Sequence, residues 1–94
     1  MEIRHRFDGH EGAFFVEENG ERLAEMRYEE AGPSKITIDH TEVSAVLKGK
    51  GVGKQLIQAG VAYAREHHLR IVPNCPFAKA EFDKTPEYAD VLSD

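Results

Sequence analysis

Hydrophobic and polar positions alternate along the first half of the chain, as they do in strands that bury one face. The alternating segments predict strands over residues 2–8, 13–17 and 35–43, whereas residues 22–29 are ambiguous between strand and helix, and the hairpin turn before them favours a strand. Glycine, asparagine and aspartate separate these segments, and they favour turns. Asn19-Gly20, between the second and third segments, is the strongest short signal for a hairpin. We therefore expect antiparallel hairpins in the first half of the chain.

The fourth segment, residues 35–43, is rich in β-branched residues, which favour strands. Its regular alternation places Ile36, Ile38 and His40 on one face and the residues between them on the other. This pattern predicts that His40 shares the apolar face of the strand.

The spacing of hydrophobic positions changes to three and four residues after Gly51, which is typical of an amphipathic helix. The apolar stripe of this predicted helix, residues 51–68, comprises Val52, Leu56, Ala59, Gly60, Tyr63 and Ala64. A short strand over residues 69–73 follows, then a helix over residues 75–83 and a last short turn over residues 85–88. The predicted order is β-β-β-β-α-β-α, an α+β fold in which the last strand runs parallel beside the fourth.

Composition narrows the class of protein. The chain has 94 residues, so we expect one domain over residues 1–94. A single cysteine excludes an internal disulfide framework, and no stretch approaches the roughly 20 apolar residues of a membrane span. The N-terminal residues lack the apolar core of a signal peptide, so we expect a cytoplasmic protein that does not bind membranes. A net charge of −5 argues against nucleic acid as a partner.

The run Lys48-Gly49-Lys50-Gly51-Val52-Gly53-Lys54 places three lysines and three glycines at the start of the predicted long helix. Glycines allow close approach to backbone N–H groups, and a helix N-terminus carries about half a positive charge. The run therefore predicts a binding site for a small phosphorylated ligand. An ordinary glycine-rich turn is the alternative, although each glycine costs roughly 0.5–1 kcal/mol of backbone entropy.

Two familiar phosphate loops do not fit this run. A Walker loop requires a glycine where Lys48 stands and a hydroxyl residue where Gln55 stands. In a dinucleotide-binding fingerprint the third glycine would fall on Lys54 or Leu56, depending on the start.

The loop and the element order resemble those of the Gcn5-related N-acetyltransferases (GNAT). Three sequence blocks carry the resemblance: Asp39-His40-Thr41-x-Val43, Gly49-x-Gly51-Val52-Gly53 and Cys75-Pro76-Phe77-Ala78-Lys79. The resemblance implies an enzyme that transfers an acetyl group from its cofactor acetyl-coenzyme A to an amine. It also implies that the loop amides hold the pyrophosphate and that the fourth strand splays from the fifth to admit the pantetheine arm.

By this resemblance, residues from all three blocks and the loop line the coenzyme, with Asn74 as a hydrogen-bonding residue, Phe77 as a packing residue and Lys79 directed toward a phosphate. The expected coenzyme-binding residues are Thr41, Glu42, Val43, Lys48, Gly49, Lys50, Gly51, Val52, Gly53, Lys54, Asn74, Phe77 and Lys79.

Two residues are candidates for proton transfer or nucleophilic catalysis. An imidazole can exchange protons near neutral pH, so His40 is a candidate general base. Cys75 stands at a predicted helix start, where it could protonate the leaving thiolate or briefly accept the acetyl group. Ordinary packing of His40 on the apolar face and of Cys75 in the core is the alternative. Adjacent His67 and His68 point apart on a helix, and the sequence predicts no metal site.

The chain departs from the family in one respect. Typical members insert two helices between the first two strands, whereas here only Gly9 to Gly12 separate them. We therefore expect either a large acceptor, such as a protein terminus or lysine, or a second subunit that completes the groove. The expected oligomeric state is a monomer or a weak homodimer. A non-catalytic acyl-coenzyme A-binding module and a small protein-interaction domain remain the alternative functions.

Overall fold

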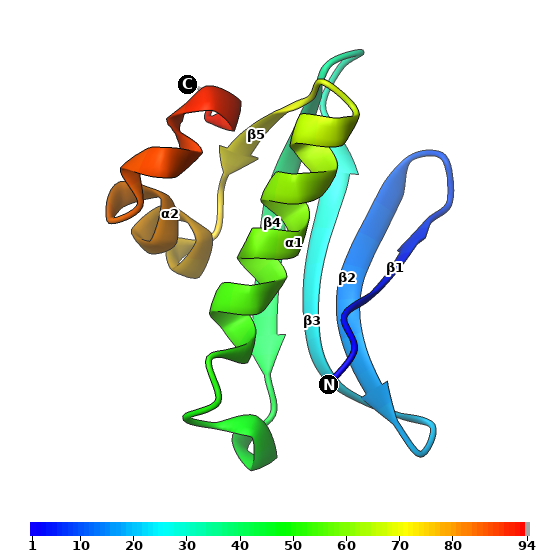
Figure 1. The fold of residues 1–94 in the computed structure, drawn as a ribbon. Coiled ribbons are helices and arrows are strands. Elements are labelled where there is room, and N and C mark those ends of the chain that lie inside the picture. The colour runs from blue at the N-terminus through cyan, green and yellow to red at the C-terminus, as the bar shows by residue number, and fades with distance from the viewer. Residues whose placement is uncertain (94) are drawn as a thin grey trace.

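The structure, a computed structural model, describes residues 1–93 and has an α+β fold (Figure 1). Its sheet contains five strands in sequence order: β1 (Arg4–Phe7), β2 (Glu11–Glu18), β3 (Glu21–Glu30), β4 (Lys35–Val43) and β5 (Arg70–Pro73). The first four strands pair antiparallel, and β5 runs parallel to β4. The predicted fold class, element order and parallel last strand are therefore confirmed.

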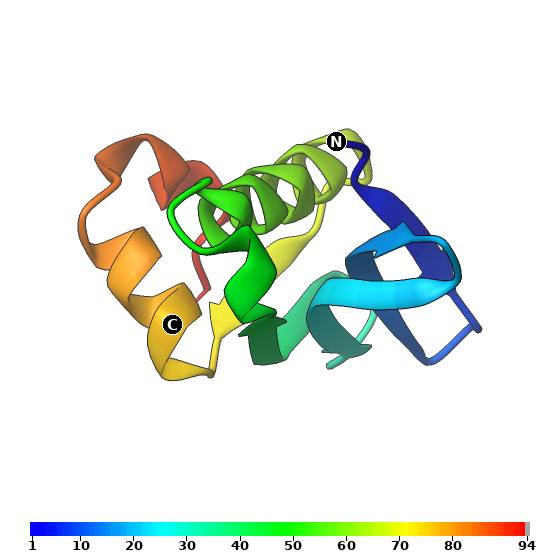
Figure 2. The ribbon, with the colours of Figure 1, turned by 90° about the horizontal axis from the view of Figure 1, so that it is seen from below.

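The helical elements are η1 (Ala45–Leu47), α1 (Val52–Glu66), α2 (Pro76–Asp83) and η2 (Pro86–Val91). Helix α1 packs on one face of the sheet against β2, β3 and β4, while α2 and η2 lie beside β5 (Figure 2). The short 3₁₀ helix η1 between β4 and the glycine run was not predicted. It is stabilised by Ser44, whose hydroxyl accepts a hydrogen bond from the Val46 N–H group.

The buried stripe of α1 is wider than the predicted one. Ile57 and Val61 are buried in addition to Val52, Leu56, Gly60 and Ala64. They belong to the same buried core as Met26 of β3. Burial of each large apolar side chain stabilises the fold by about 1.5–3 kcal/mol.

Strand β4 contains a β-bulge. Arg27 of β3 pairs with His40, but the next residue, Tyr28, pairs with Ile38, so Asp39 is an extra residue in β4. An extra residue reverses which face the following side chains occupy.

The prediction that His40 shares a face with Ile36 and Ile38 is therefore wrong. After the bulge, Thr41 and Val43 take the face that is covered by α1, because they pair with buried Met26 and Ala24. His40 is exposed and lies on the opposite face.

Strands β4 and β5 diverge after a short paired region, as the resemblance implied. Their pairing extends only from Lys35 to Ile38 of β4, and β4 continues well beyond the end of β5 (Figure 1). The Ile38 carbonyl accepts hydrogen bonds from the N–H groups of Asn74 and Cys75 at 3.0 and 3.1 Å, which closes the paired region.

Beyond this point β4 has one open edge. The Ser44 N–H group donates to the Leu23 carbonyl at 2.7 Å. Because backbone groups in a strand alternate in direction, those of Thr41 and Val43 point away from β3, toward the side that β5 has left. Backbone hydrogen-bonding groups are thus available along this edge.

His5 of β1 packs against aromatic side chains of β2 and β3, and these contacts predict a pH dependence of stability. The His5 ring stacks on Phe14 at 4.2 Å, and its Nε2 atom lies 2.6 Å from the Tyr28 hydroxyl. Burial, and then the charge of nearby His67, lower the pKa of His5 below its ordinary value. The unfolded chain therefore takes up a proton at this site more readily than the folded chain, so the free energy of unfolding decreases as pH falls through about 6.5.

Urea denaturation between pH 7.5 and pH 5.5 measures this effect. We expect His5→Phe to reduce the pH dependence, and we expect the control His68→Asn, at an exposed position, to retain it. An undiminished pH dependence in His5→Phe would contradict the assignment.

Candidate functional site

The glycine run presents free backbone N–H groups at the start of α1. Gly49 and Gly51 have φ angles of +82° and +67°, which side-chain-bearing residues rarely adopt. Gly51 is the N-cap of α1, and the first N–H group of the helix with a backbone acceptor is that of Gln55. Within residues 1–93, the N–H groups from Gly51 to Lys54 have no acceptor. Such an array together with the helix dipole binds anions.

The three lysines of the run increase the positive potential of the loop. Lys48, Lys50 and Lys54 are exposed, and none forms an ion pair with the part of the chain that the structure describes. Their charges are therefore available to a ligand.

A hollow of about 280 Å³ lies beside the loop, between the end of β4 and α2. Phe77, from the third sequence block, lines this hollow and is 38% exposed. Its ring lies so close to Gly53 that a Cβ atom there would be 2.7 Å from the Phe77 Cζ atom. Glycine at this position therefore allows the two blocks to meet.

Every residue of the glycine run except Lys50 lines this hollow, and all of them were among the predicted coenzyme-binding residues. The lining residues of the hollow are Val43, Leu47, Lys48, Gly49, Gly51, Val52, Gly53, Lys54, Phe77 and Glu81. Sequence reasoning missed Leu47 and Glu81. The spacing of four between Phe77 and Glu81 on α2 was the available signal, since it places both on one helix face.

Cys75 is buried at the N-cap of α2, next to the open edge of β4. Its Sγ atom accepts a hydrogen bond from the Ala78 N–H group at 3.4 Å. The Thr41 hydroxyl lies 3.4 Å from the same sulfur, and either atom can donate. The bulge in β4 makes this contact possible, because it turns Thr41 toward the α1 face.

His40 lies on the opposite face of β4 from Thr41. It lines a hollow of about 200 Å³ together with Glu11, Arg27, Tyr28, Glu29 and Asp39. The structure therefore places the two predicted catalytic residues on opposite sides of β4. Cys75 contacts the side chain of Thr41, and His40 is the residue before Thr41 in the strand.

The remaining predicted residues lie at the margin of the site. The Asn74 side chain is exposed, and its backbone N–H group donates to the Ile38 carbonyl. Lys79 is exposed on α2, where its Nζ atom lies 3.4 Å from Asp83 Oδ1. Glu42 is exposed on the same face of the sheet as His40. None of these three lines the hollow beside the glycine loop.

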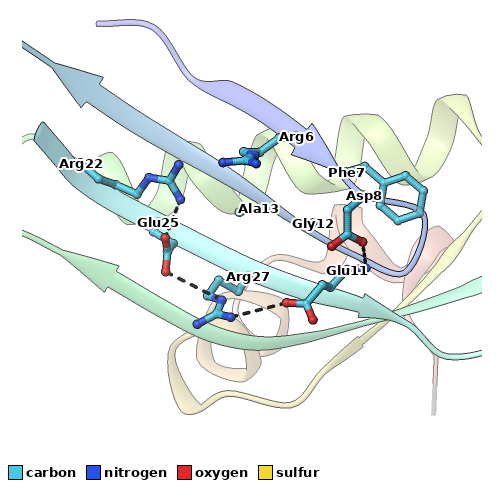
Figure 3. Close-up of a pocket in the computed structure, with 9 residues that line it drawn as sticks. All are labelled: Arg6, Phe7, Asp8, Glu11, Gly12, Ala13, Arg22, Glu25 and Arg27. Carbon is cyan, nitrogen blue, oxygen red and sulfur yellow. Dashed lines mark hydrogen bonds and ion pairs between the residues drawn. The ribbon is translucent and has the colours of Figure 1, made fainter. Parts of the chain in front are cut away.

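The sheet face opposite α1 is covered by paired charges and carries no helix within residues 1–93 (Figure 2). Figure 3 shows a chain of ion pairs along this face, in which Arg27 contacts Glu11 at 3.5 Å and Glu25 at 3.9 Å. Arg22 lies 2.8 Å from Glu25 and stacks on the Phe15 ring. These side chains border a shallow hollow of about 260 Å³.

Within residues 1–93, no three His, Cys, Asp or Glu side chains are grouped as metal ligands. No helix in this part of the chain has the length and apolar character needed to cross a membrane.

Comparisons with known proteins agree with this geometry. A family model described as GCN5-related N-acetyl-transferase matches residues 13–91. Protein NATD1 of Bos taurus is 29% identical over 93 residues, which cover 96% of this chain and 82% of that protein.

Solved structures show the same fold. The solution structure of a GCN5-like protein from Staphylococcus aureus is 38% identical, has a TM-score of 0.72 and matches over 97% of this chain and 88% of that chain. A ribosomal-protein-alanine N-acetyltransferase from Brucella melitensis biovar Abortus 2308 shares the fold alone, with a TM-score of 0.60 at 21% identity over 93% of this chain and 64% of that chain. Since the family model extends from β2 to the end of η2, the chain belongs to the GCN5-related N-acetyltransferase family.

Proposed function

We propose that this protein transfers an acetyl group from acetyl-coenzyme A to an amine. The observation that carries the proposal is the array of free N–H groups at the start of α1, from Gly51 to Lys54. These groups and the neighbouring lysines would bind the diphosphate of the coenzyme. The open edge of β4 at Thr41 and Val43 supplies backbone partners for the amide groups of the pantetheine arm.

The residues around the β4 bulge suit the proton transfers of the reaction. The amine nitrogen attacks the thioester carbonyl carbon, the carbon–sulfur bond breaks, and the leaving thiolate gains a proton as the amine loses one. His40 is the proposed base for the amine, because it is exposed on the face from which an acceptor can approach. Cys75, which shares a contact with the Thr41 hydroxyl, is the proposed proton donor to the leaving thiolate.

The acceptor amine is proposed to be cationic and carried by a larger molecule. The hollow around His40 is lined by three carboxylates, of Glu11, Glu29 and Asp39, and by one cation, Arg27, which Glu11 pairs. The excess of negative charge in this hollow favours the approach of a protonated amine from solution. A face that carries no helix within residues 1–93 suits a protein N-terminus or lysine, or a groove completed by a second subunit.

Calorimetric titration of the purified protein tests the binding step. We expect acetyl-coenzyme A to bind with a dissociation constant in the micromolar range, a free energy of about −8 kcal/mol. ATP and NAD serve as controls and should bind at least about tenfold more weakly. No binding of acetyl-coenzyme A would overturn the proposed function.

A further inference from the structure

Glu81 is a buried carboxylate at the hollow beside the glycine loop. It is 5% exposed and lies on α2, one turn after Phe77. Its Oε1 atom lies 3.1 Å from the Lys84 Nζ atom. Its Oε2 atom is buried and has no hydrogen-bond partner within residues 1–93.

An unpartnered buried acceptor destabilises a folded protein, because its hydrogen bonds to water are lost and not replaced. A hydrophobic residue at this position of α2 would avoid that loss. The carboxylate lines the hollow together with Phe77 and the loop glycines. Because Glu81 lines the hollow, a rotation of its carboxylate would bring the buried, unpartnered oxygen to a ligand bound there.

The charge of Glu81 restricts which ligand group can contact it. A phosphate oxygen next to Oε2 would be repelled, whereas an N–H or O–H donor would form a charge-assisted hydrogen bond. A ligand that combines an anionic group for the loop amides with a nearby donor satisfies both parts of the site.

We propose that Glu81 is a specificity-determining residue, whose Oε2 atom accepts a hydrogen bond from an N–H or O–H group of the ligand next to its diphosphate. The inference rests on the proposed binding of coenzyme A. That ligand carries donors on both sides of its diphosphate: a hydroxyl and amides in the pantetheine arm, and ribose and adenine groups on the nucleotide. Glu81 then disfavours ligands that offer only phosphates near the loop.

Affinities for coenzyme A and for its two halves test the inference. Calorimetry compares the wild-type protein, Glu81→Leu and Glu81→Gln with coenzyme A, 4′-phosphopantetheine and adenosine 3′,5′-bisphosphate. We expect Glu81→Leu to bind coenzyme A at least about tenfold more weakly, the usual effect of losing a hydrogen bond to a charged group. Glu81→Gln, which keeps an acceptor oxygen, should lose less. Of the two half-molecules, only the one that carries the hydrogen-bond donor should bind Glu81→Leu more weakly than wild type. The result therefore identifies on which side of the diphosphate the donor lies.

A matched control and thermal unfolding separate this role from a structural one. Glu87→Gln removes the same charge at an exposed position outside the hollow, and should bind coenzyme A as the wild-type protein does. The free Glu81→Leu protein should unfold at the same or a higher temperature, because an unpartnered buried oxygen is removed.

Equal affinity of Glu81→Leu and wild type for coenzyme A would overturn the inference alone. A parallel loss of affinity for both halves with a lower unfolding temperature would also overturn it, since this indicates a structural role. A wild-type protein that does not bind coenzyme A would overturn the proposed function and the inference with it.

Discussion

Gly53→Leu is expected to weaken the binding of coenzyme A by at least about 100-fold, which corresponds to two lost hydrogen bonds to charged groups. The Phe77 ring lies where the new side chain must begin, 2.7 Å from the position of a Cβ atom. The leucine must therefore displace this ring or enter the hollow, and either change covers the N–H groups that would bind the diphosphate. The measurement is calorimetric titration with coenzyme A.

The same substitution should leave the protein folded. Phe77 is partly exposed and can move outward, and leucine favours helices more than glycine does. Ala62→Leu is the matched control, because it adds the same bulk at an exposed position of α1 away from the loop. Gly53→Leu protein that is folded and binds coenzyme A as tightly as Ala62→Leu would contradict the assignment of the loop.

The backbone geometry of the glycine run could be predicted because it is local. Glycine at Gly49 and Gly51 is required by positive φ angles in the turn itself, and the following helix depends on a nearby hydrophobic pattern. The order of the strands was likewise predictable from alternation and turn residues. These features depend on residues that are close together in the sequence.

The face occupied by His40 could not be predicted, because it depends on pairing between strands. The alternation of residues 35–43 is regular in the sequence, and the bulge at Asp39 arises only from the register with Arg27 and Tyr28 of β3. The buried position of Glu81 was missed for a similar reason. A glutamate on a short helix is ordinarily exposed, and this one is buried because α2 packs near the start of α1.

His40→Ala is expected to lower the rate of acetyl transfer by about 100- to 10,000-fold near neutral pH, the usual contribution of a general base. The affinity for acetyl-coenzyme A should be unchanged, because His40 lies on the opposite face of β4 from Thr41 and does not line the hollow beside the loop. The loss should shrink as pH rises, since a larger fraction of the acceptor amine is then already deprotonated. The measurement is the pH profile of kcat with a panel of protein and small-molecule amines.

His68→Asn is the matched control for this substitution, because His68 is an exposed histidine that follows α1 and does not line the hollow around His40. It should retain the wild-type rate. A His40→Ala rate equal to that of His68→Asn would exclude His40 as the base.

The substitutions at Cys75 distinguish an acid from a packing residue. The sulfur caps α2 and contacts the Thr41 hydroxyl, so serine retains a hydrogen-bonding group there and alanine does not. A proton donor to the leaving thiolate predicts a large loss in Cys75→Ala and partial recovery in Cys75→Ser, whereas a packing role predicts similar rates for both. If both Cys75→Ala and His40→Ala retain the wild-type rate with a reactive amine, the catalytic assignment is wrong. If, in addition, the wild-type protein binds acetyl-coenzyme A but acetylates no amine, the protein is a module that binds the coenzyme through the free N–H groups of the loop without catalysis.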